Sequence, residues 1–155
     1  MKNIDHPDTQ EKNPMNDETE KSSEESEVVP EEKPSKIGRI EWMDLTVDDA
    51  SSVRNFYTSV VGWSSSEVDM GSYSDFNINL PDTQDTIAGV CHSRGSDSNI
   101  PSQWLIYVRV ESVAESAQSC KRLGGEILDG PRRMGGSNFC VIKDPAGAVM
   151  ALLSD

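Results

Sequence analysis

The feature of this sequence that most constrains its fold is an internal repeat. When the chain is shifted by 63 residues, similar residues coincide over about fifty positions without a gap: Leu45 meets Val108 and Gly62 meets Gly125. A fixed internal period predicts two copies of one supersecondary unit, neither of which can bury its apolar face alone. Two such units that face each other would enclose one cavity.

The first 37 residues differ in composition from the rest of the chain. They contain no aromatic residue, and five basic residues stand against 11 acidic ones. Such a stretch buries too little apolar surface to offset the entropy of ordering, so residues 1–37 are predicted to be a disordered acidic tail. The tail has no apolar run typical of a secretory signal. It would serve as a solubilising extension or as a docking segment for a basic partner.

Residues 38–155 are long enough for one domain with a core of its own. This part is also acidic, with nine basic and 16 acidic residues, which argues against nucleic acid and anionic membranes as partners. No run approaches the length of a membrane span. The cysteines, Cys91, Cys120 and Cys140, are odd in number and lack CxxC spacing, which favours free thiols in the cytoplasm.

The first copy of the repeat, residues 38–95, reads as strand, helix and three strands. A helix is expected after Asp48 or Asp49, because Val53, Phe56, Tyr57 and Val60 share one helical face. A glycine at position 62 can end it. Strands are expected at 40–47, near 66–70, at 75–80 and at 87–92.

The second copy, residues 102–155, repeats this order. Ser112 and Glu115 match a capping box, and Gly124 and Gly125 would stop the helix. Strands are expected at 104–110, 126–128, 138–143 and 148–153. The fold class is therefore α+β, with two tandem βαβββ modules whose sheets curve into a cup-shaped incomplete barrel.

Strand alternation predicts which side chains line the cup. Residues Met43, Leu45 and Val47 should pack under the first helix. The cup-facing set would comprise Trp42, Asp44, Thr46, Asn77, Asn79, Ala88, Val90 and His92 in the first copy, and Leu105, Tyr107, Arg109, Cys140, Ile142, Ala151 and Leu153 in the second.

This pattern resembles the vicinal oxygen chelate superfamily, which includes glyoxalase I, extradiol dioxygenases and bleomycin-resistance proteins. The resemblance rests on Leu45-Thr46-Val47 leading to Asp49, on Phe56-Tyr57, on Val61-Gly62-Trp63, and in the second copy on Leu123-Gly124-Gly125 and Asp144-Pro145-Ala146-Gly147. It covers residues 39–154 and looks like a bacterial glyoxalase-like branch. The resemblance implies the cup-shaped fold. It also makes a homodimer a prediction, because members pair their modules within or between chains.

The metal site of that superfamily is not expected in this chain, and no cofactor is predicted. Catalytic members place His, Glu or Gln ligands at four cup positions, which correspond here to Trp42, Ala88, Leu105 and Ala151. None of these side chains can bind a divalent cation, which needs about three protein ligands. A register change of one residue would offer Glu41, but alternation places that residue on the opposite face.

A polar set remains inside the predicted cup. Trp42, Asn77, Asn79 and Arg109 are the expected ligand-binding residues, with Arg109 holding a carboxylate or another anion. Asp44, Tyr107 and His92 are the expected catalytic residues, with His92 relaying a proton. Asp44 would pair with Arg109 or hydrogen-bond to Tyr107, and the first of these could equally be an internal structural ion pair. Arg132 and Arg133 would form an exposed turn or a gate at the mouth of the cup.

The leading hypothesis is a metal-independent glyoxalase-like protein that binds a small organic molecule in its cup, with turnover left open. One alternative is a lyase or isomerase of the superfamily with a nonstandard metal site around Asp44 and His92. The other is a non-enzymatic interaction module that uses the acidic tail.

Overall fold

The computed structural model describes residues 36–155. The predictions about the acidic tail and His6 therefore lie outside the described residues, apart from Lys36 and Ile37. Within the described part, no helix combines the length and the apolar character needed to cross a bilayer.

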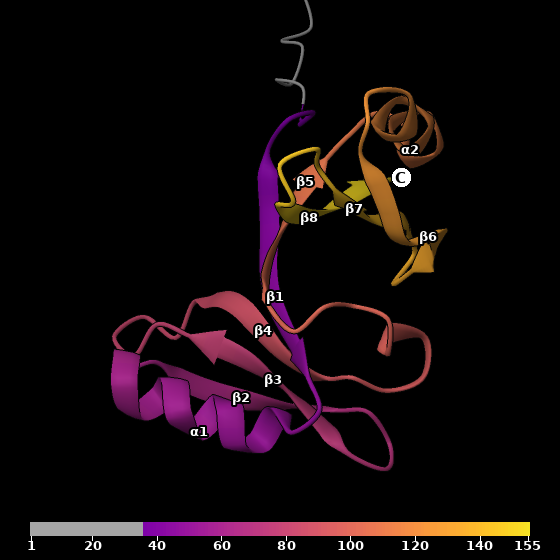
Figure 1. Cartoon of the computed structure of the whole chain (residues 1–155). Coiled ribbons are helices and arrows are strands. Elements are labelled where there is room, and N and C mark those ends of the chain that lie inside the picture. The colour runs from indigo at the N-terminus through magenta and orange to yellow at the C-terminus, as the bar shows by residue number, and fades with distance from the viewer. Residues whose placement is uncertain (1–35) are drawn as a thin grey trace, which may run out of the picture. The chain divides into compact units, whose positions relative to one another are not determined.

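Eight strands and two α-helices form this part of the chain, so the α+β class is confirmed. Strand, helix and three strands follow one another twice (Figure 1), separated by a short 3₁₀ helix, η1. The elements are β1 (Ile40–Val47), α1 (Ala50–Val61), β2 (Ser64–Asp69), β3 (Ser74–Asn79), β4 (Thr86–His92), η1 (Gly95–Asp97), β5 (Trp104–Arg109), α2 (Val113–Arg122), β6 (Glu126–Met134), β7 (Ser137–Lys143) and β8 (Val149–Ser154).

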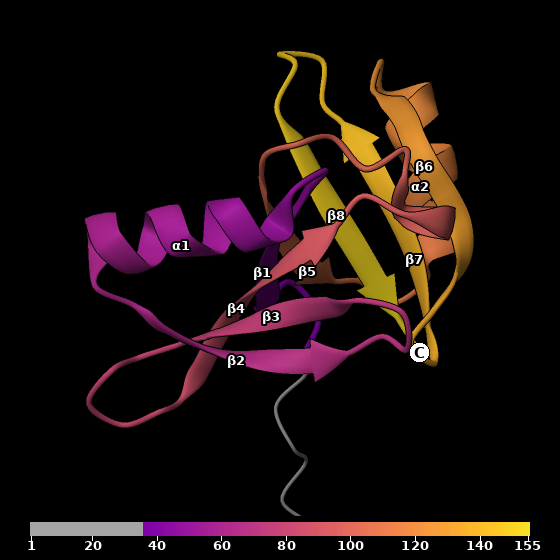
Figure 2. The same cartoon turned by 90° about the horizontal axis from the view of Figure 1, so that it is seen from below.

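All eight strands belong to one mixed sheet with the order β2-β3-β4-β1-β5-β8-β7-β6. The first strands of the two halves lie at its centre, where β1 and β5 pair antiparallel. Each of them also pairs in parallel with the last strand of its own half, β1 with β4 and β5 with β8. Helix α1 covers the first-half strands and α2 covers β6, β7 and β8 (Figure 2).

Both helices begin at the caps that the sequence predicts. The Asp49 carboxylate accepts a hydrogen bond from the Ser52 amide at 3.0 Å, and the Ser112 hydroxyl accepts one from the Glu115 amide at 3.3 Å. These bonds satisfy amide groups that have no partner within the helix. Gly62 ends α1 in the left-handed conformation, with φ of 83°.

The apolar face predicted for the first helix is only partly buried. Val53 and Tyr57 pack against the core, but Phe56 and Val60 are 57% and 64% exposed. Ala50, one turn before Val53, is fully buried, so the stripe through 50, 53 and 57 faces the sheet. Phe56 and Val60 lie on the flank of the helix beside it.

The two faces of the sheet carry different cores. On the helix-covered face, Leu45, Phe76, Ile78 and Val90 pack under α1. In the second half, Val113 and Ala117 of α2 pack against Cys140 and Leu152 of the sheet. The opposite face, here called the helix-free face, carries a third cluster in the second half. Its buried members are Ile100, Leu105, Tyr107, Phe139, Val141 and Ala151.

Strand pairing corrects several of the predicted directions. Asp44 lies opposite Gly89, and Leu45 lies opposite Val90, so Ala88, Val90 and His92 share the helix-covered side with Leu45. In the second half, Val141 lies opposite Ala151, which puts Cys140 and Ile142 under α2. Leu105, Tyr107, Ala151 and Leu153 do belong to the helix-free face, as predicted.

The cause is that no single shift superposes the two halves. Asp44 and Tyr107 differ by 63, but their parallel neighbours Gly89 and Ala151 differ by 62. Because side chains alternate with period 2, a change of one residue reverses every side chain in the strand.

Replacing Gly130 by alanine tests how closely β6 packs against β7. The φ of Gly130 is +80°, and a Cβ there would lie 2.6 Å from the Phe139 carbonyl oxygen, whereas Gly136 has φ of +89° and open space around it. Both Gly→Ala changes should lose about 1 kcal/mol of unfolding free energy through the left-handed backbone, and Gly130→Ala about 1–3 kcal/mol more through the clash. Urea denaturation of the two variants checks this, and equal losses would contradict it.

Candidate functional site

The candidate site lies where β1 and β5 meet on the helix-free face. Trp42 and Tyr107 are directly opposite each other across the antiparallel pair, and Asp44 follows two residues after Trp42. Gly89 of β4 lies beside them: a Cβ at that position would be 3.3 Å from the Asp44 Cβ and 3.5 Å from the Trp42 ring. The glycine therefore leaves room for the indole next to the carboxylate.

Asp44 and Tyr107 form the central polar contact of this site. The Tyr107 hydroxyl lies 2.9 Å and 3.0 Å from the two Asp44 carboxylate oxygens and donates to the carboxylate. The sequence offered Arg109 or Tyr107 as the partner of Asp44, and the structure shows Tyr107 in contact with it.

Burial decides the ionisation of this pair. Loss of solvation raises the pKa of Asp44 to about 6, while hydrogen bonds from Tyr107 and Trp42 act in the opposite direction, and Asp97 and Asp75 add repulsion. Burial and the neighbouring Asp44 also raise the pKa of Tyr107, so its hydroxyl keeps its proton. The site thus holds a carboxyl group that titrates close to neutrality beside a fixed donor.

The predicted ligand-binding asparagines differ in their availability. Asn77 lies opposite Gly89 and so shares the face of Asp44. Asn79 is 5% exposed; its amide donates to Ser66 at 3.2 Å and accepts from Thr86 at 2.8 Å. Asn79 is therefore engaged in joining β2, β3 and β4.

His92 does not share the face of Asp44. It lies opposite Val47 at the end of β4, and its backbone amide and Nδ1 both contact one Asp75 oxygen, at 2.8 Å and 3.1 Å. The ring stands 5.4 Å from the Tyr73 ring, centroid to centroid. The prediction that His92 faces inward is wrong because the last strand of the first half is displaced by one residue from the assumed repeat.

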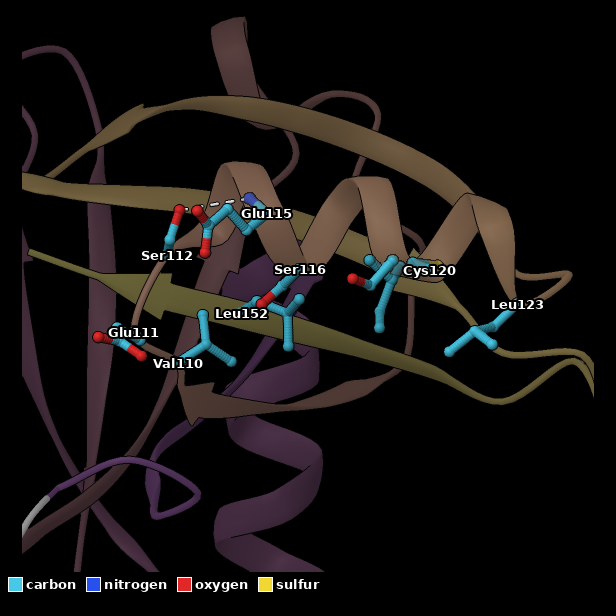
Figure 3. A pocket seen from close by; sticks show the side chains of 10 residues that line it. Val110, Glu111, Ser112, Glu115, Ser116, Cys120, Leu123 and Leu152 are labelled. Atoms are coloured by element: carbon cyan, nitrogen blue, oxygen red, sulfur yellow. Dashed lines mark hydrogen bonds between the residues drawn. The ribbon is translucent and has the colours of Figure 1, made fainter.

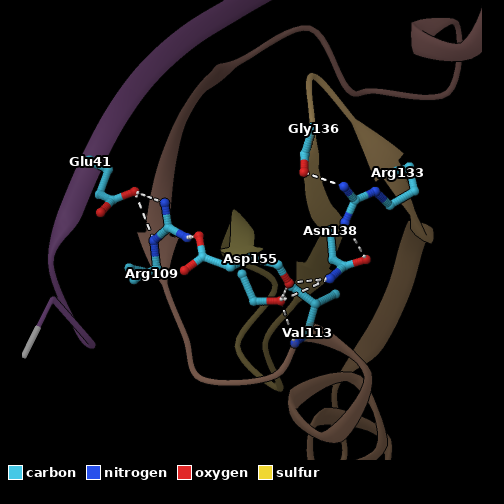
Figure 4. Close-up of polar contacts among 8 residues, drawn as sticks. Glu41, Arg109, Val113, Arg133, Gly136, Asn138 and Asp155 are labelled. Carbon is cyan, nitrogen blue, oxygen red and sulfur yellow. Dashed lines mark hydrogen bonds and ion pairs between the residues drawn. The ribbon is translucent and has the colours of Figure 1, made fainter.

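Arg109 is already bound by carboxylates of the same chain. Its Nε and Nη2 donate to Glu41 at 2.9 Å and 2.6 Å, and Nη1 donates to Asp155 at 2.6 Å (Figure 4). The hydrogen bonds from the Arg109 guanidinium hold the pKa of Glu41 below its usual value. Glu41 reaches Arg109 because β1 has a bulge between Ile40 and Trp42, which corrects the prediction that Glu41 points away.

The residues present do not fit the metal site of the vicinal oxygen chelate pattern. Trp42, Leu105 and Ala151 occupy the expected positions, and on β4 the residue beside Asp44 is Gly89 rather than Ala88. No side-chain ligand atom for a divalent cation is present at Trp42, Gly89, Leu105 or Ala151. Among residues 36–155, no three His, Cys, Asp or Glu side chains gather closely enough to hold an ion.

Phe139 is a residue of this face that the sequence reasoning missed, and Arg132, predicted as part of an exposed turn or a gate, lies beside it. The Phe139 ring stacks on Tyr107 at 5.8 Å, and the Arg132 guanidinium lies 4.8 Å above the Phe139 ring. Arg132 also pairs with Asp97 and Asp129, so it is neither an exposed turn residue nor a free cation. Cys91 belongs to the same surroundings, but burial raises its pKa to about 12, which keeps it a thiol.

Two hollows are lined by residues other than Trp42, Asp44 and Tyr107. One, of about 470 Å³, runs along α2, with Ile142, Leu152 and Leu123 among its apolar lining and Glu111 and Glu115 among its acidic lining (Figure 3). The other, of about 340 Å³, lies beside Arg109 and Asp155. Their linings hold no group comparable to the Asp44–Tyr107 pair.

The raised pKa of Asp44 makes a prediction about stability. The folded-state value lies above that of the unfolded chain, so the folded protein holds the extra proton between them, and the free energy of unfolding falls as pH rises through this window. Asp44→Asn should therefore gain about 1 kcal/mol relative to wild type between about pH 5 and pH 8. Denaturation at both pH values measures the gain. The exposed Asp48→Asn is the control, and an equal gain there would refute the burial argument.

Sequence comparison finds curated proteins that are similar to this chain. Anthracycline biosynthesis protein DnrV of Streptomyces peucetius is 26% identical over 123 residues, covering 72% of this chain and 45% of its own length. Anthracycline biosynthesis protein DauV of Streptomyces sp. strain C5 is 24% identical over 123 residues, with the same coverage. The chain thus spans about half the length of these curated relatives.

Among solved structures, methylmalonyl-CoA epimerase from Mycobacterium tuberculosis matches with a TM-score of 0.43 and 15% identity, covering 78% of this chain and 90% of the epimerase. The sequence model of one family matches residues 38–152, nearly the whole described part. The chain therefore belongs to the Glyoxalase/Bleomycin resistance protein/Dioxygenase superfamily.

Proposed function

We propose that this domain binds a small organic molecule on the helix-free face at Trp42, Asp44 and Tyr107, without the metal site of the superfamily. The observation that carries the proposal is the half-buried Asp44 carboxyl, which is hydrogen-bonded to Tyr107 and whose pKa is raised to about 6. A buried carboxylate with such a pKa destabilises the fold, and shifted groups of this kind concentrate at functional sites.

The contacts define what kind of molecule would fit. Asp44 can donate or accept a hydrogen bond according to its ionisation, and Tyr107 supplies a hydroxyl that stays protonated. The Trp42 indole offers an apolar surface beside them, so a ligand with one polar group on a flat apolar body would use all three.

Charge favours neutral or cationic ligands over anions. Asp75 and Asp97 both act electrostatically on Asp44, and all three are acidic. The nearby arginines are neutralised, Arg132 by Asp97 and Asp129, and Arg109 by Glu41 and Asp155. This argues against the earlier expectation that Arg109 holds a carboxylate, because an anion would have to displace two existing ion pairs.

The raised pKa also supports a role for Asp44 in proton transfer, with Tyr107 as its hydrogen-bonding partner. A general base or acid works best when its pKa lies near the working pH. His92 is a poor candidate for the relay because it lies opposite Val47 on the helix-covered side and its Nδ1 contacts Asp75.

Binding to Tyr107→Phe tests the proposal. A panel of neutral, cationic and anionic aromatic fragments is titrated by two-dimensional NMR, and the fragments that bind should shift the signals of Trp42, Asp44 and Gly89. Loss of the Tyr107 hydroxyl should weaken the binding of these fragments about tenfold. Tyr57→Phe is the matched control, because the Tyr57 hydroxyl bonds Trp104 on the helix-covered face. Equal weakening in both variants would show an effect on stability rather than on binding.

Thermal stability with added divalent cations distinguishes this proposal from a metal-dependent lyase or isomerase. Protein treated with a chelator should keep its Tm when Mn²⁺, Ni²⁺ or Zn²⁺ is added, compared with sodium chloride of equal ionic strength, because the face lacks a ligand set. A stoichiometric ion with a clear rise in Tm would favour the metal-dependent alternative.

The interaction module remains the second class of function. Its working part would be residues 1–37, so removing them should abolish binding of a basic partner and leave fragment binding unchanged. Homodimerisation is likewise a prediction that analytical ultracentrifugation can test.

A further inference from the structure

The segment between β4 and β5, residues 93–103, covers part of the helix-free face. Ile100 is its one buried residue, 5% exposed, and it packs in the same cluster as Leu105, Tyr107 and Phe139. The rest of the segment is exposed or half-buried. A single apolar side chain therefore inserts from this segment into the second half of the face.

One arginine ties the segment to β6. Nη2 of Arg132 donates to the Ser96 carbonyl at 3.2 Å and to Asp97 Oδ1 at 2.9 Å, while Nε donates to Asp129 at 2.9 Å. Asp129 is nearly buried, whereas the Asp97 side chain is 36% exposed. Arg132 is thus anchored on β6 by the inner carboxylate and reaches the segment through the outer one.

We propose that residues 93–103 form a displaceable lid, with the Arg132–Asp97 contact as its latch and Ile100 as its plug. With the lid closed, Tyr107 is 2% exposed and Phe139 is fully buried. Opening would uncover both rings, and a ligand with a larger apolar body would then extend from Asp44 onto them. This step rests on the proposed function, because the covered surface continues the Asp44 site.

The contacts make local opening inexpensive compared with unfolding. The ends of the segment are bonded to strands, the Ser93 amide to the Val47 carbonyl of β1 at 2.8 Å and the Gln103 side chain to the Val149 carbonyl of β8 at 3.4 Å. Between these ends the backbone hydrogen bonds are short-range, such as Ile100 N to the Asp97 carbonyl at 3.1 Å. Segments with few buried apolar contacts open at a free energy well below that of global unfolding. The stack of Arg132 on Phe139 and of Phe139 on Tyr107 links the latch to the ring that holds Asp44.

Hydrogen exchange of the full chain tests the latch without any ligand. Arg132→Met keeps an apolar stem against Phe139 but removes the guanidinium, and the amides of Asp97 and Ile100 should then exchange about tenfold faster or more. Arg133→Met is the matched control: this neighbouring arginine bonds Gly136 and Asn138 within its own hairpin. Exchange in that variant should equal wild type.

The β1–β5 amides show whether opening is local. If hydrogen exchange of these amides becomes faster together with that of the segment in Arg132→Met, the segment is part of the cooperative core and the lid is refuted. Unchanged exchange of the segment refutes the latch. Should Arg132→Met fail to fold, Asp97→Asn removes the outer contact alone and carries the same expectations.

Nile red, a neutral apolar dye, tests what the lid covers. Its affinity should rise about tenfold in Arg132→Met and stay at the wild-type value in Arg133→Met. Faster segment exchange without tighter dye binding would mean that the covered rings are not a ligand surface, which overturns the proposal. If the Tyr107→Phe fragment experiment fails while both lid results hold, the proposed Asp44 site is wrong but the lid stands.

Discussion

The antiparallel pairing of β1 with β5 is the constraint on which the rest of the structure depends. It joins the two halves into one sheet through the registers Trp42↔Tyr107 and Asp44↔Leu105. Because the pairing puts Met43 and Leu45 on the same side as Ile106 and Trp104, both helices cover one face, and the other face is left for the site. The same register brings the Tyr107 hydroxyl onto the Asp44 carboxylate, residues that are 63 apart in the chain.

Asp44 and Arg109 show two outcomes for charged groups on one face. Arg109 forms ion pairs with Glu41 and Asp155, so a ligand anion would have to compete with these carboxylates for its guanidinium. Asp44 has a neutral phenol as its main partner and keeps an unfavourable ionisation. The Arg109 ion pairs are partly exposed and join opposite charges, whereas Asp44 has no cationic partner to offset its loss of solvation. The candidate site therefore has a carboxyl group with a raised pKa at Asp44, while Arg109 is already engaged by carboxylates of the same chain.

The sequence predicted the elements and caps better than the directions of side chains. Asp49, Ser112 and Gly62 act where their local chemistry indicated, because a cap depends only on residues within one helical turn. His92 and Cys140 were assigned to the wrong face, and Phe139 was missed. Each of these errors follows from assuming one constant shift, when bulges at Ile40/Trp42, Ile78/Asn79 and within β6 change the count of residues between paired positions.

By itself, the sequence determined the α+β class, the order of strands and helices, the family to which residues 38–152 belong, and the absence of metal-binding side chains at Trp42, Leu105 and Ala151. Only the tertiary structure decided that Asp44 meets Tyr107, that Glu41 captures Arg109, and that Ile100 and Arg132 place the segment 93–103 over the aromatic surface. The physical reason is that periodicity and capping are local properties of the chain. Strand register and bulges, in contrast, are settled by pairing between residues far apart in sequence, and a displacement of one residue exchanges the two faces of a strand.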